Sequence, residues 1–283
     1  MKKMIIAAAA FFVSVLPLFA GKRLTDIEQS VIDDFWNVRM ELTCLEEKQD
    51  AVKILDSYKE THKEQVEQLG EEASLLLDAI ILMERYNYLY SFPGENKESR
   101  KEFSKIRSKM KDYMEDKEED ELTPYMYLFY ADITSYYMAY SIKDIIFNGL
   151  SVKRNYEKAI KTDGEFSPAM VNLAQWYYYS PGIFGGSKEL TVEWQLKAIE
   201  FARNNAEKFY AKSAYSQVLF EAGKIEESQK ELNDCSELCP ESRFIQLLKE
   251  QNAMGNSLND YNKQRSKLLK KADDYKKKNA IEE

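Results

Sequence analysis

The chain has 283 residues, a formal charge of −8 and a single histidine, His62. Its 10 glycines and 6 prolines fall well below the usual shares of about 7% and 5%, which favours long helices over an all-β fold. The acidic balance argues against a general nucleic-acid binder, because phosphate recognition needs a basic surface. One histidine excludes a multi-histidine metal site. We therefore expect no metal, no cofactor and no enzymatic activity.

Residues 1–20 are typical of a secretory signal peptide. Lys2 and Lys3 precede an apolar run that ends at Pro17 and is shorter than the roughly 20 residues needed to span a bilayer. We expect a periplasmic or otherwise exported protein, cleaved after Ala20, and the alternative is an uncleaved N-terminal anchor. No cysteine follows the apolar run, which argues against attachment of a lipid.

Residues 21–121 predict helical hairpins, because apolar residues recur at helical spacing. The expected helices cover 25–42, 51–58, 73–90 and 97–114. Thr25 or Asp26 is placed to cap the first of them, and Phe92-Pro93-Gly94 is expected to stop the third. The charged run 115–121 is expected to be a solvated connection.

Residues 122–258 predict tetratricopeptide-like repeats, each of which is a pair of helices. Small residues recur where paired helices approach closely, at Ala131, Ala174 and Ser216, with spacings of 43 and 42 residues. Each pair leaves an apolar face that the next pair covers. The alternative is an irregular helical bundle. The first expected helix covers 125–147, and after a break at 149–151 the helix resumes over 152–161. The other expected helices cover 169–179, 188–204, 206–221, 224–239 and 242–254.

Residues 259–283 form a locally basic C-terminal helix and tail. Such a helix either caps the end of the repeat stack or lies on anionic lipid, and we favour the cap. The whole of 21–283 is thus predicted to be one all-α domain, an α-solenoid of about twelve helices. Membrane contact, if there is any, is expected to be peripheral.

One segment resembles a known family. An aromatic helix end at Tyr177–Tyr179 is followed by Pro181, Gly185 and Gly186 in a P-x-x-x-G-G turn, and the next helix ends in Lys197-Ala198. This pattern resembles the tetratricopeptide proteins associated with periplasmic TRAP transporters, the TatT family. The resemblance covers about 123–240, and the enlarged turn near Gly149-Leu150 is also similar to that family.

The resemblance implies a periplasmic helical scaffold that associates with the solute-binding protein of a TRAP-type importer. It also implies a homo-trimer with a pore or cleft for a small hydrophobic ligand. The chain departs from many members of the family because it has no lipoprotein cysteine after the apolar run.

Helical repeats bind through the concave face, which is lined by the first helix of each pair. Aromatic rings give contact area there and polar groups fix orientation, which suits a peptide or a small amphipathic ligand. The alternative for each of these residues is packing in the core. The predicted concave-face residues are Tyr125, Asp132, Tyr136, Gln175, Tyr178, Tyr179, Gln217 and Phe220.

Three cysteines occur, at Cys44, Cys235 and Cys239. The last two lie four residues apart on a predicted helix, where a disulfide is geometrically unfavourable, so free thiols are favoured over a Cys235–Cys239 bond. Two cysteines without a nearby partner pair or histidine do not make a zinc site.

The sequence therefore predicts an exported helical-repeat binding scaffold, an accessory to a TRAP-type solute importer through its solute-binding protein. A general cell-envelope interaction or assembly factor is the first alternative. A carboxylate-based hydrolase is the second, although no residue pattern points to one.

Overall fold

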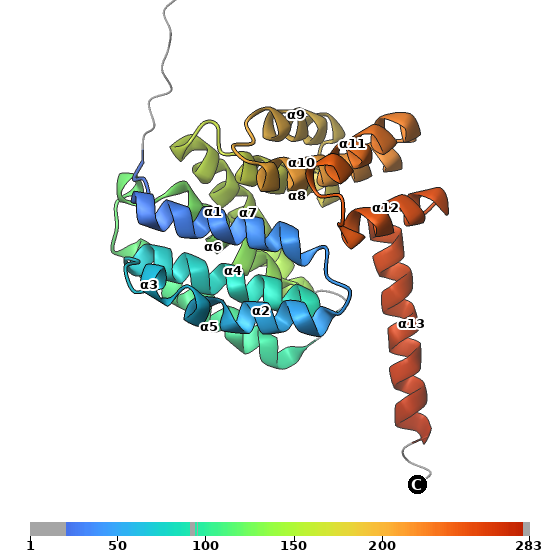
Figure 1. The fold of residues 1–283 in the computed structure, drawn as a ribbon, viewed down its shortest axis with the longest axis horizontal. Coiled ribbons are helices and arrows are strands. Elements are labelled where there is room, and N and C mark those ends of the chain that lie inside the picture. Colours follow the sequence, from blue (N-terminus) through green and yellow to red (C-terminus); the bar gives the residue numbers. More distant parts are fainter. Residues whose placement is uncertain (1–20, 91–93, 95, 280–283) are drawn as a thin grey trace, which may run out of the picture.

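The computed structural model describes residues 21–90, 94 and 96–279, and within these ranges the chain forms thirteen α-helices and no strand (Figure 1). This confirms the predicted all-α fold of helical hairpins. The predicted signal peptide and the Phe92-Pro93 part of the predicted stop lie outside the described residues.

The N-terminal third folds into α1 (Asp26–Leu42), α2 (Lys48–Thr61), the short α3 (Lys63–Val66), α4 (Glu71–Leu89) and α5 (Lys97–Glu115). The sequence predicted four of these helices and did not predict α3. Thr25 caps α1 in a capping box, because its hydroxyl accepts the N–H of Glu28 and the Glu28 carboxylate accepts the N–H of Thr25. Within the charged connection, Glu119–Glu121 form a single 3₁₀ turn.

The repeats are three helix pairs: α6 (Pro124–Met138) with α7 (Ile142–Thr162), α8 (Ser167–Tyr179) with α9 (Lys188–Glu200), and α10 (Asn205–Glu221) with α11 (Ile225–Leu238). The small residues Ala131, Ala174 and Ser216 are all fully buried. Their burial at equivalent places confirms the register of the repeats, since a small side chain there lets two helices approach.

The predicted break at 149–151 is wrong. α6 ends at Met138, and α7 runs without interruption from Ile142 to Thr162. Ser141 begins α7, because its hydroxyl accepts the N–H of Asp144 at 3.4 Å, whereas one glycine inside a helix costs only about 1 kcal/mol. The residues that looked like an enlarged turn are therefore about two extra N-terminal turns of α7.

The C-terminal part consists of α12 (Arg243–Ala253) and α13 (Leu258–Asn279). α13 starts against the repeats, where the amide oxygen of Gln217 accepts the N–H of Leu258 at 2.8 Å, and then runs away from the molecule (Figure 1). Many side chains of its basic half, including those of Lys276, Lys277 and Lys278, lie outside the described part of the structure. The choice between a cap and a lipid contact stays a prediction.

α1 crosses the face formed by the first helices of the repeats (Figure 1). On α6, the Tyr125 hydroxyl accepts a hydrogen bond from the Gln29 amide at 3.0 Å. On α10, the Tyr210 ring meets the Trp36 ring edge to face, with centroids 5.9 Å apart. α1 therefore spans from the first repeat to the third and covers a groove that the repeats alone leave open.

A buried carboxylate fastens α4 to the start of the repeats. Glu72 is 2% exposed, and its Oε1 accepts both the backbone N–H and the hydroxyl of Thr123, at 2.9 and 2.6 Å. Its Oε2 accepts the Lys22 ammonium at 2.9 Å. Glu72→Ala leaves these donors without their acceptor and should cost about 3 kcal/mol in the free energy of unfolding, measured in urea.

The matched control is Glu102→Ala on the exposed face of α5, which should change stability by no more than about 0.5 kcal/mol. Equal losses in the two variants would show that Glu72 does not fasten the two regions together.

Candidate ligand-binding cavity

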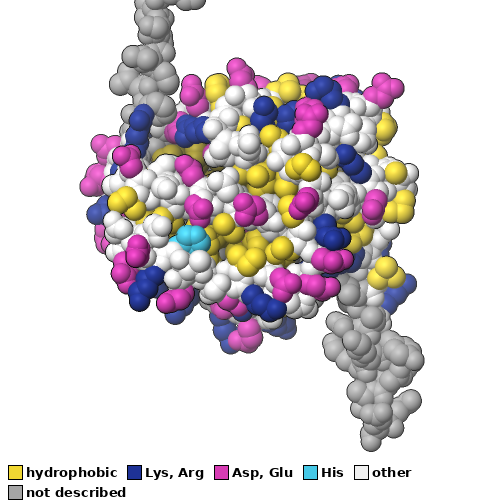
Figure 2. Space-filling model, viewed as in Figure 1, with side chains coloured by type: hydrophobic (Ala, Val, Ile, Leu, Met, Phe, Trp, Pro, Cys, Tyr) yellow, Lys and Arg dark blue, Asp and Glu magenta, His cyan; other side chains and the backbone are white. Residues whose placement is uncertain are grey.

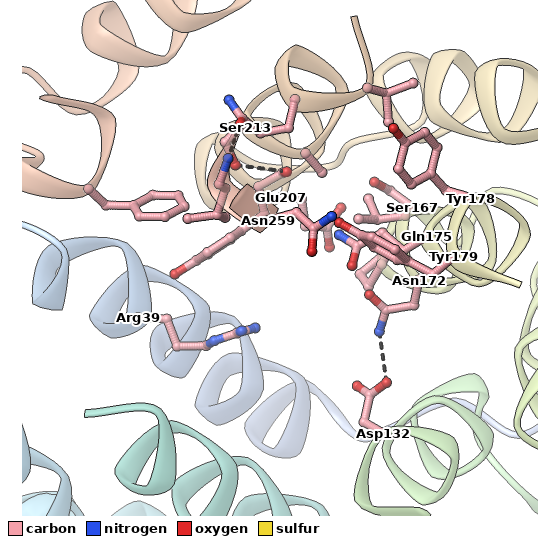
Figure 3. Close-up of a pocket in the computed structure, with 18 of the residues that line it drawn as sticks. Arg39, Asp132, Ser167, Asn172, Gln175, Tyr178, Tyr179, Glu207, Ser213 and Asn259 are labelled. Atoms are coloured by element: carbon pink, nitrogen blue, oxygen red, sulfur yellow. Dashed lines mark hydrogen bonds between the residues drawn. The ribbon is translucent and has the colours of Figure 1, made fainter. Parts of the chain in front are cut away.

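Two adjacent cavities lie where α1 and α4 meet the repeats. One has a volume of about 740 Å³ and is here called the apolar chamber. The other, of about 290 Å³, is called the polar pocket and is drawn in Figure 3. They are adjacent, because five residues line both of them: Arg39, Asp132, Asn172, Gln175 and Tyr179.

The apolar chamber is walled by α4, α6, α7, α8 and the loop after α8. Its wall includes the extra turns of α7 and the 3₁₀ turn Gly182–Phe184. Both segments are enlargements of the basic repeat, so the two insertions in the sequence build the same end of one cavity. Its apolar lining residues are Ile80, Met83, Phe129, Met138, Ile145, Ile146, Leu150, Val152, Trp176 and Phe184.

Arg39 marks the junction of the chamber and the pocket. Its guanidinium pairs with the buried Glu84 carboxylate, Nη2 to Oε1, at 2.6 Å. It also lies 4.3 Å from the Trp36 ring centroid and 4.7 Å from that of Tyr210, an arrangement that favours a cation electrostatically. The buried Nε of Arg39 has no hydrogen-bond partner within the described chain.

Asp132 faces Arg39 from α6 (Figure 3). Its Oδ1 accepts hydrogen bonds from the Tyr156 hydroxyl and the Asn172 amide, each at 2.8 Å. Burial raises the pKa of Asp132 to about 7, although the hydrogen bond from Tyr156 and the charge of Arg39 act in the opposite direction. The carboxyl therefore changes charge near neutral pH.

This pKa makes stability depend on pH in a definite direction. The unfolded carboxyl titrates near pH 4, so between about pH 4 and 7 the folded protein holds a proton that the unfolded chain has lost. Stability contributed by Asp132 therefore falls as pH rises through this window. We expect Asp132→Asn, which keeps an acceptor oxygen, to stabilise the protein by about 1–2 kcal/mol at pH 8 and much less at pH 5.

Urea denaturation of both proteins at the two pH values measures this difference. An equal effect of Asp132→Asn at pH 5 and pH 8 would contradict a raised pKa at this position.

Six of the eight predicted concave-face residues line the site. Tyr136 lines the chamber, and its hydroxyl donates to the Asn87 side chain at 2.7 Å. The others line the polar pocket, where the Tyr178 hydroxyl donates to the Glu221 carboxylate. These five are Asp132, Gln175, Tyr178, Tyr179 and Gln217.

Tyr125 and Phe220, the other two predicted residues, line neither cavity. Tyr125 is 3% exposed, and α1 covers it. Phe220 is half-buried, and the α10 residues that line the pocket follow a stripe that ends at Glu221 instead. Adjacent residues on a helix point in directions about 100° apart, so a stripe that includes Glu221 leaves Phe220 facing another direction.

The P-x-x-x-G-G segment has a conformational role. Gly185 adopts a φ of +95°, which favours glycine. At Gly186 a Cβ would lie 1.8 Å from the backbone oxygen of Ser180. The N–H of Gly186 donates to the Pro181 carbonyl at 3.2 Å and closes the turn. Pro181 also lines the chamber, so the turn shapes its wall.

Sequence reasoning missed the lining residues outside the repeats. They are Trp36 and Arg39 of α1, Ile80, Met83 and Glu84 of α4, Phe244 of α12, and Leu258 and Asn259 of α13. Trp36 and Arg39 are three residues apart, so they share one face of α1. That spacing is visible in the sequence, but only the packing of α1 across the repeats shows that the two residues line a cavity.

Exposed apolar side chains lie on α7 and on the 3₁₀ turn Gly182–Phe184, two segments that also line the chamber. Phe147 is 73% exposed and Ile183 is 88% exposed. We call this set the apolar rim: Ile142, Ile146, Phe147, Leu150, Ile183 and Phe184. Such a cluster is typical of a surface that meets a partner or a ligand. By contrast, the face in Figure 2 mixes apolar side chains with acidic and basic ones.

Comparison with known proteins adds no family. No protein-family model matches the chain, and no curated protein matches it. Among the described residues, no helix is long and apolar enough to cross a membrane. The described part of the chain also contains no group of three or more His, Cys, Asp or Glu side chains placed to hold a metal ion.

Proposed function

We propose that the protein is an exported helical-repeat receptor that holds a small amphipathic ligand beneath α1. The observation that carries this proposal is a pair of adjacent cavities, one lined mainly by apolar side chains and the other by amide, hydroxyl and carboxyl groups among aromatic and aliphatic ones. The chamber volume of about 740 Å³ lies within the range of about 300–1,000 Å³ of small-molecule sites.

The two cavities together define the class of ligand. A hydrocarbon body fits the chamber, where apolar contact supplies most of the binding free energy. A head group with hydrogen-bond donors and acceptors fits between Gln175 and Asp132 at the junction. Arg39 is already paired with Glu84, so the junction favours a neutral polar head over a strongly charged one.

The proposed partner is the solute-binding protein of a TRAP-type importer, as the resemblance of 123–240 to the TatT family implies. The apolar rim supports a partner that docks over the chamber, because the rim and the chamber share Ile146, Leu150 and Phe184. A partner docked there covers the opening through which the ligand passes. The proposed assembly is a homo-trimer in the periplasm.

Native mass spectrometry of the purified mature protein, alone and with envelope extract, tests this proposal. We expect a trimer that retains a solute-binding protein, and we expect the partner to be lost from the double variant Phe147→Ser/Ile183→Ser, since this change removes the most exposed apolar area of the rim.

The matched control is Ile225→Ser on α11, a residue that is 52% exposed and lines neither cavity. It should retain the partner. A bare monomer without a partner would favour the alternative, a general envelope interaction or assembly factor. Loss of the partner from the control as well would show that the rim is not the docking surface.

A further inference from the structure

Two cysteines that are 195 residues apart in the chain meet in the folded protein. The Sγ atoms of Cys44 and Cys239 are 3.3 Å apart. Cys44 follows the end of α1 and is half-buried, and Cys239 follows the end of α11 and is 8% exposed. Both are free thiols in this structure.

The surrounding contacts hold these two segments together independently of the sulfur atoms. The hydroxyls of Thr43 and Ser242 are hydrogen-bonded at 2.8 Å. The backbone N–H of Arg243 donates to the Thr43 carbonyl at 2.9 Å. The end of α1 is therefore fixed against the loop between α11 and α12, and the meeting of the thiols is part of the fold.

We propose that Cys44 and Cys239 form a disulfide in the exported protein and that this bond fastens α1 over the cavity. A disulfide has an S–S distance of about 2.05 Å, so the two sulfur atoms, now 3.3 Å apart, need to approach by only about 1.2 Å. The inference rests on two thiols, their anchored backbones and the proposed export, and it needs neither the proposed ligand nor the proposed partner.

The reaction is a thiol–disulfide exchange with an oxidant of the disulfide class. The thiolate of one cysteine attacks the oxidant, releases one thiol and forms a mixed disulfide. The second cysteine then attacks the mixed disulfide and releases the second thiol. The two protein thiols lose two electrons and two protons as the S–S bond forms, and the oxidant is reduced to two thiols.

The low reactivity of the Cys44 thiol means that oxidation of the two cysteines needs a catalyst or a long incubation. Burial, followed by the hydrogen bond and the charge of Cys239, raises the pKa of Cys44 to about 11. Little thiolate is present at neutral pH, and the thiolate is the nucleophile. Oxidation is therefore expected to be slow without an envelope thiol oxidase, and complete in the oxidising envelope.

Cys235 provides an internal control. It is fully buried, and its thiol donates to the Phe209 carbonyl at 3.5 Å. Burial raises its pKa to about 12. The sulfur of Cys239 meets Cys44 instead, so the Cys235–Cys239 pairing that the sequence raised is not the one that the fold favours. Cys235 should stay reduced.

Peptide mapping of the full chain tests the bond. The protein is recovered from an oxidising envelope under acid, unfolded and alkylated, and a second sample is purified reduced and incubated with oxidised glutathione. In both, we expect one cross-linked peptide containing Cys44 and Cys239 and an alkylated Cys235. Alkylation of all three cysteines, or a stable glutathione adduct on Cys44, would overturn the proposal.

Thermal unfolding tests what the bond does. A disulfide that closes so long a loop should raise the midpoint of the oxidised wild type by about 5–10 °C over the reduced protein. Cys44→Ser and Cys239→Ser should lose this response to reductant, and Cys235→Ser should keep it. Equal midpoints for oxidised and reduced wild type would show that the bond does not fasten α1, whereas loss of ligand with the shift intact would count only against the proposed function.

Discussion

Arg39→Ala should lower the free energy of unfolding by about 3–5 kcal/mol, the largest loss expected of any single change discussed here. The substitution leaves the Glu84 carboxylate, which is 8% exposed, buried without its cation. It also removes the guanidinium that lies against the rings of Trp36 and Tyr210 and so links α1 to α10. Urea denaturation at pH 7 measures the loss.

Two further variants identify the cause. Arg39→Met with Glu84→Leu removes both charges and should recover most of the loss, because replacing a whole buried pair by apolar residues is often neutral. Arg85→Ala breaks the exposed pair with Asp56 and should cost at most about 1 kcal/mol. If Arg39→Ala and Arg85→Ala lowered the free energy of unfolding equally, the ion pair between Arg39 and Glu84 would not be what holds α1 over the cavity.

Leu150→Asp should weaken binding of a neutral apolar probe, N-phenyl-1-naphthylamine, by about 10- to 100-fold. Leu150 lines the chamber, and it is 53% exposed at its opening, so the substitution leaves the core intact. The change removes apolar contact worth about 1.5–3 kcal/mol and adds a charge that the probe would desolvate. Fluorescence titration gives the dissociation constants.

Ile142→Asp is the matched control for this experiment. Ile142 lies on the same helix and is 78% exposed, and it does not line the chamber. The two variants carry the same new charge on α7, so probe binding should be close to wild type in Ile142→Asp. Equal weakening would show that the probe binds the exposed rim and not the chamber.

Most of the fold follows from patterns that are local in the sequence. The apolar stripes and caps predicted nearly every helix, because helix starts depend on residues such as Thr25 and Thr123 that bond to the next turn. The error at Gly149 has a local cause too. The prediction treated Gly149 as a helix breaker. The stronger signal was the N-cap at Ser141, and packing offsets the cost of one glycine inside the helix.

Only part of the site was predictable, because its residues come from segments that are far apart in the sequence. Gln175, Tyr178 and Tyr179 follow from the register of the repeats, which fixes the face that each first helix presents. Arg39 could not be placed, because nothing local shows that α1 crosses the repeats. The same packing buried Tyr125, which the repeat register alone had put in the groove.

A small molecule retained by the purified protein would be the strongest support for a ligand-binding cavity. Native mass spectrometry of the purified protein, followed by release and analysis of small molecules, should show one amphipathic molecule per chain. Occupancy should fall in Leu150→Asp and stay at the wild-type level in Ile142→Asp. A cavity that is empty in the wild type, or equally occupied in both variants, would show that the chamber does not bind a ligand.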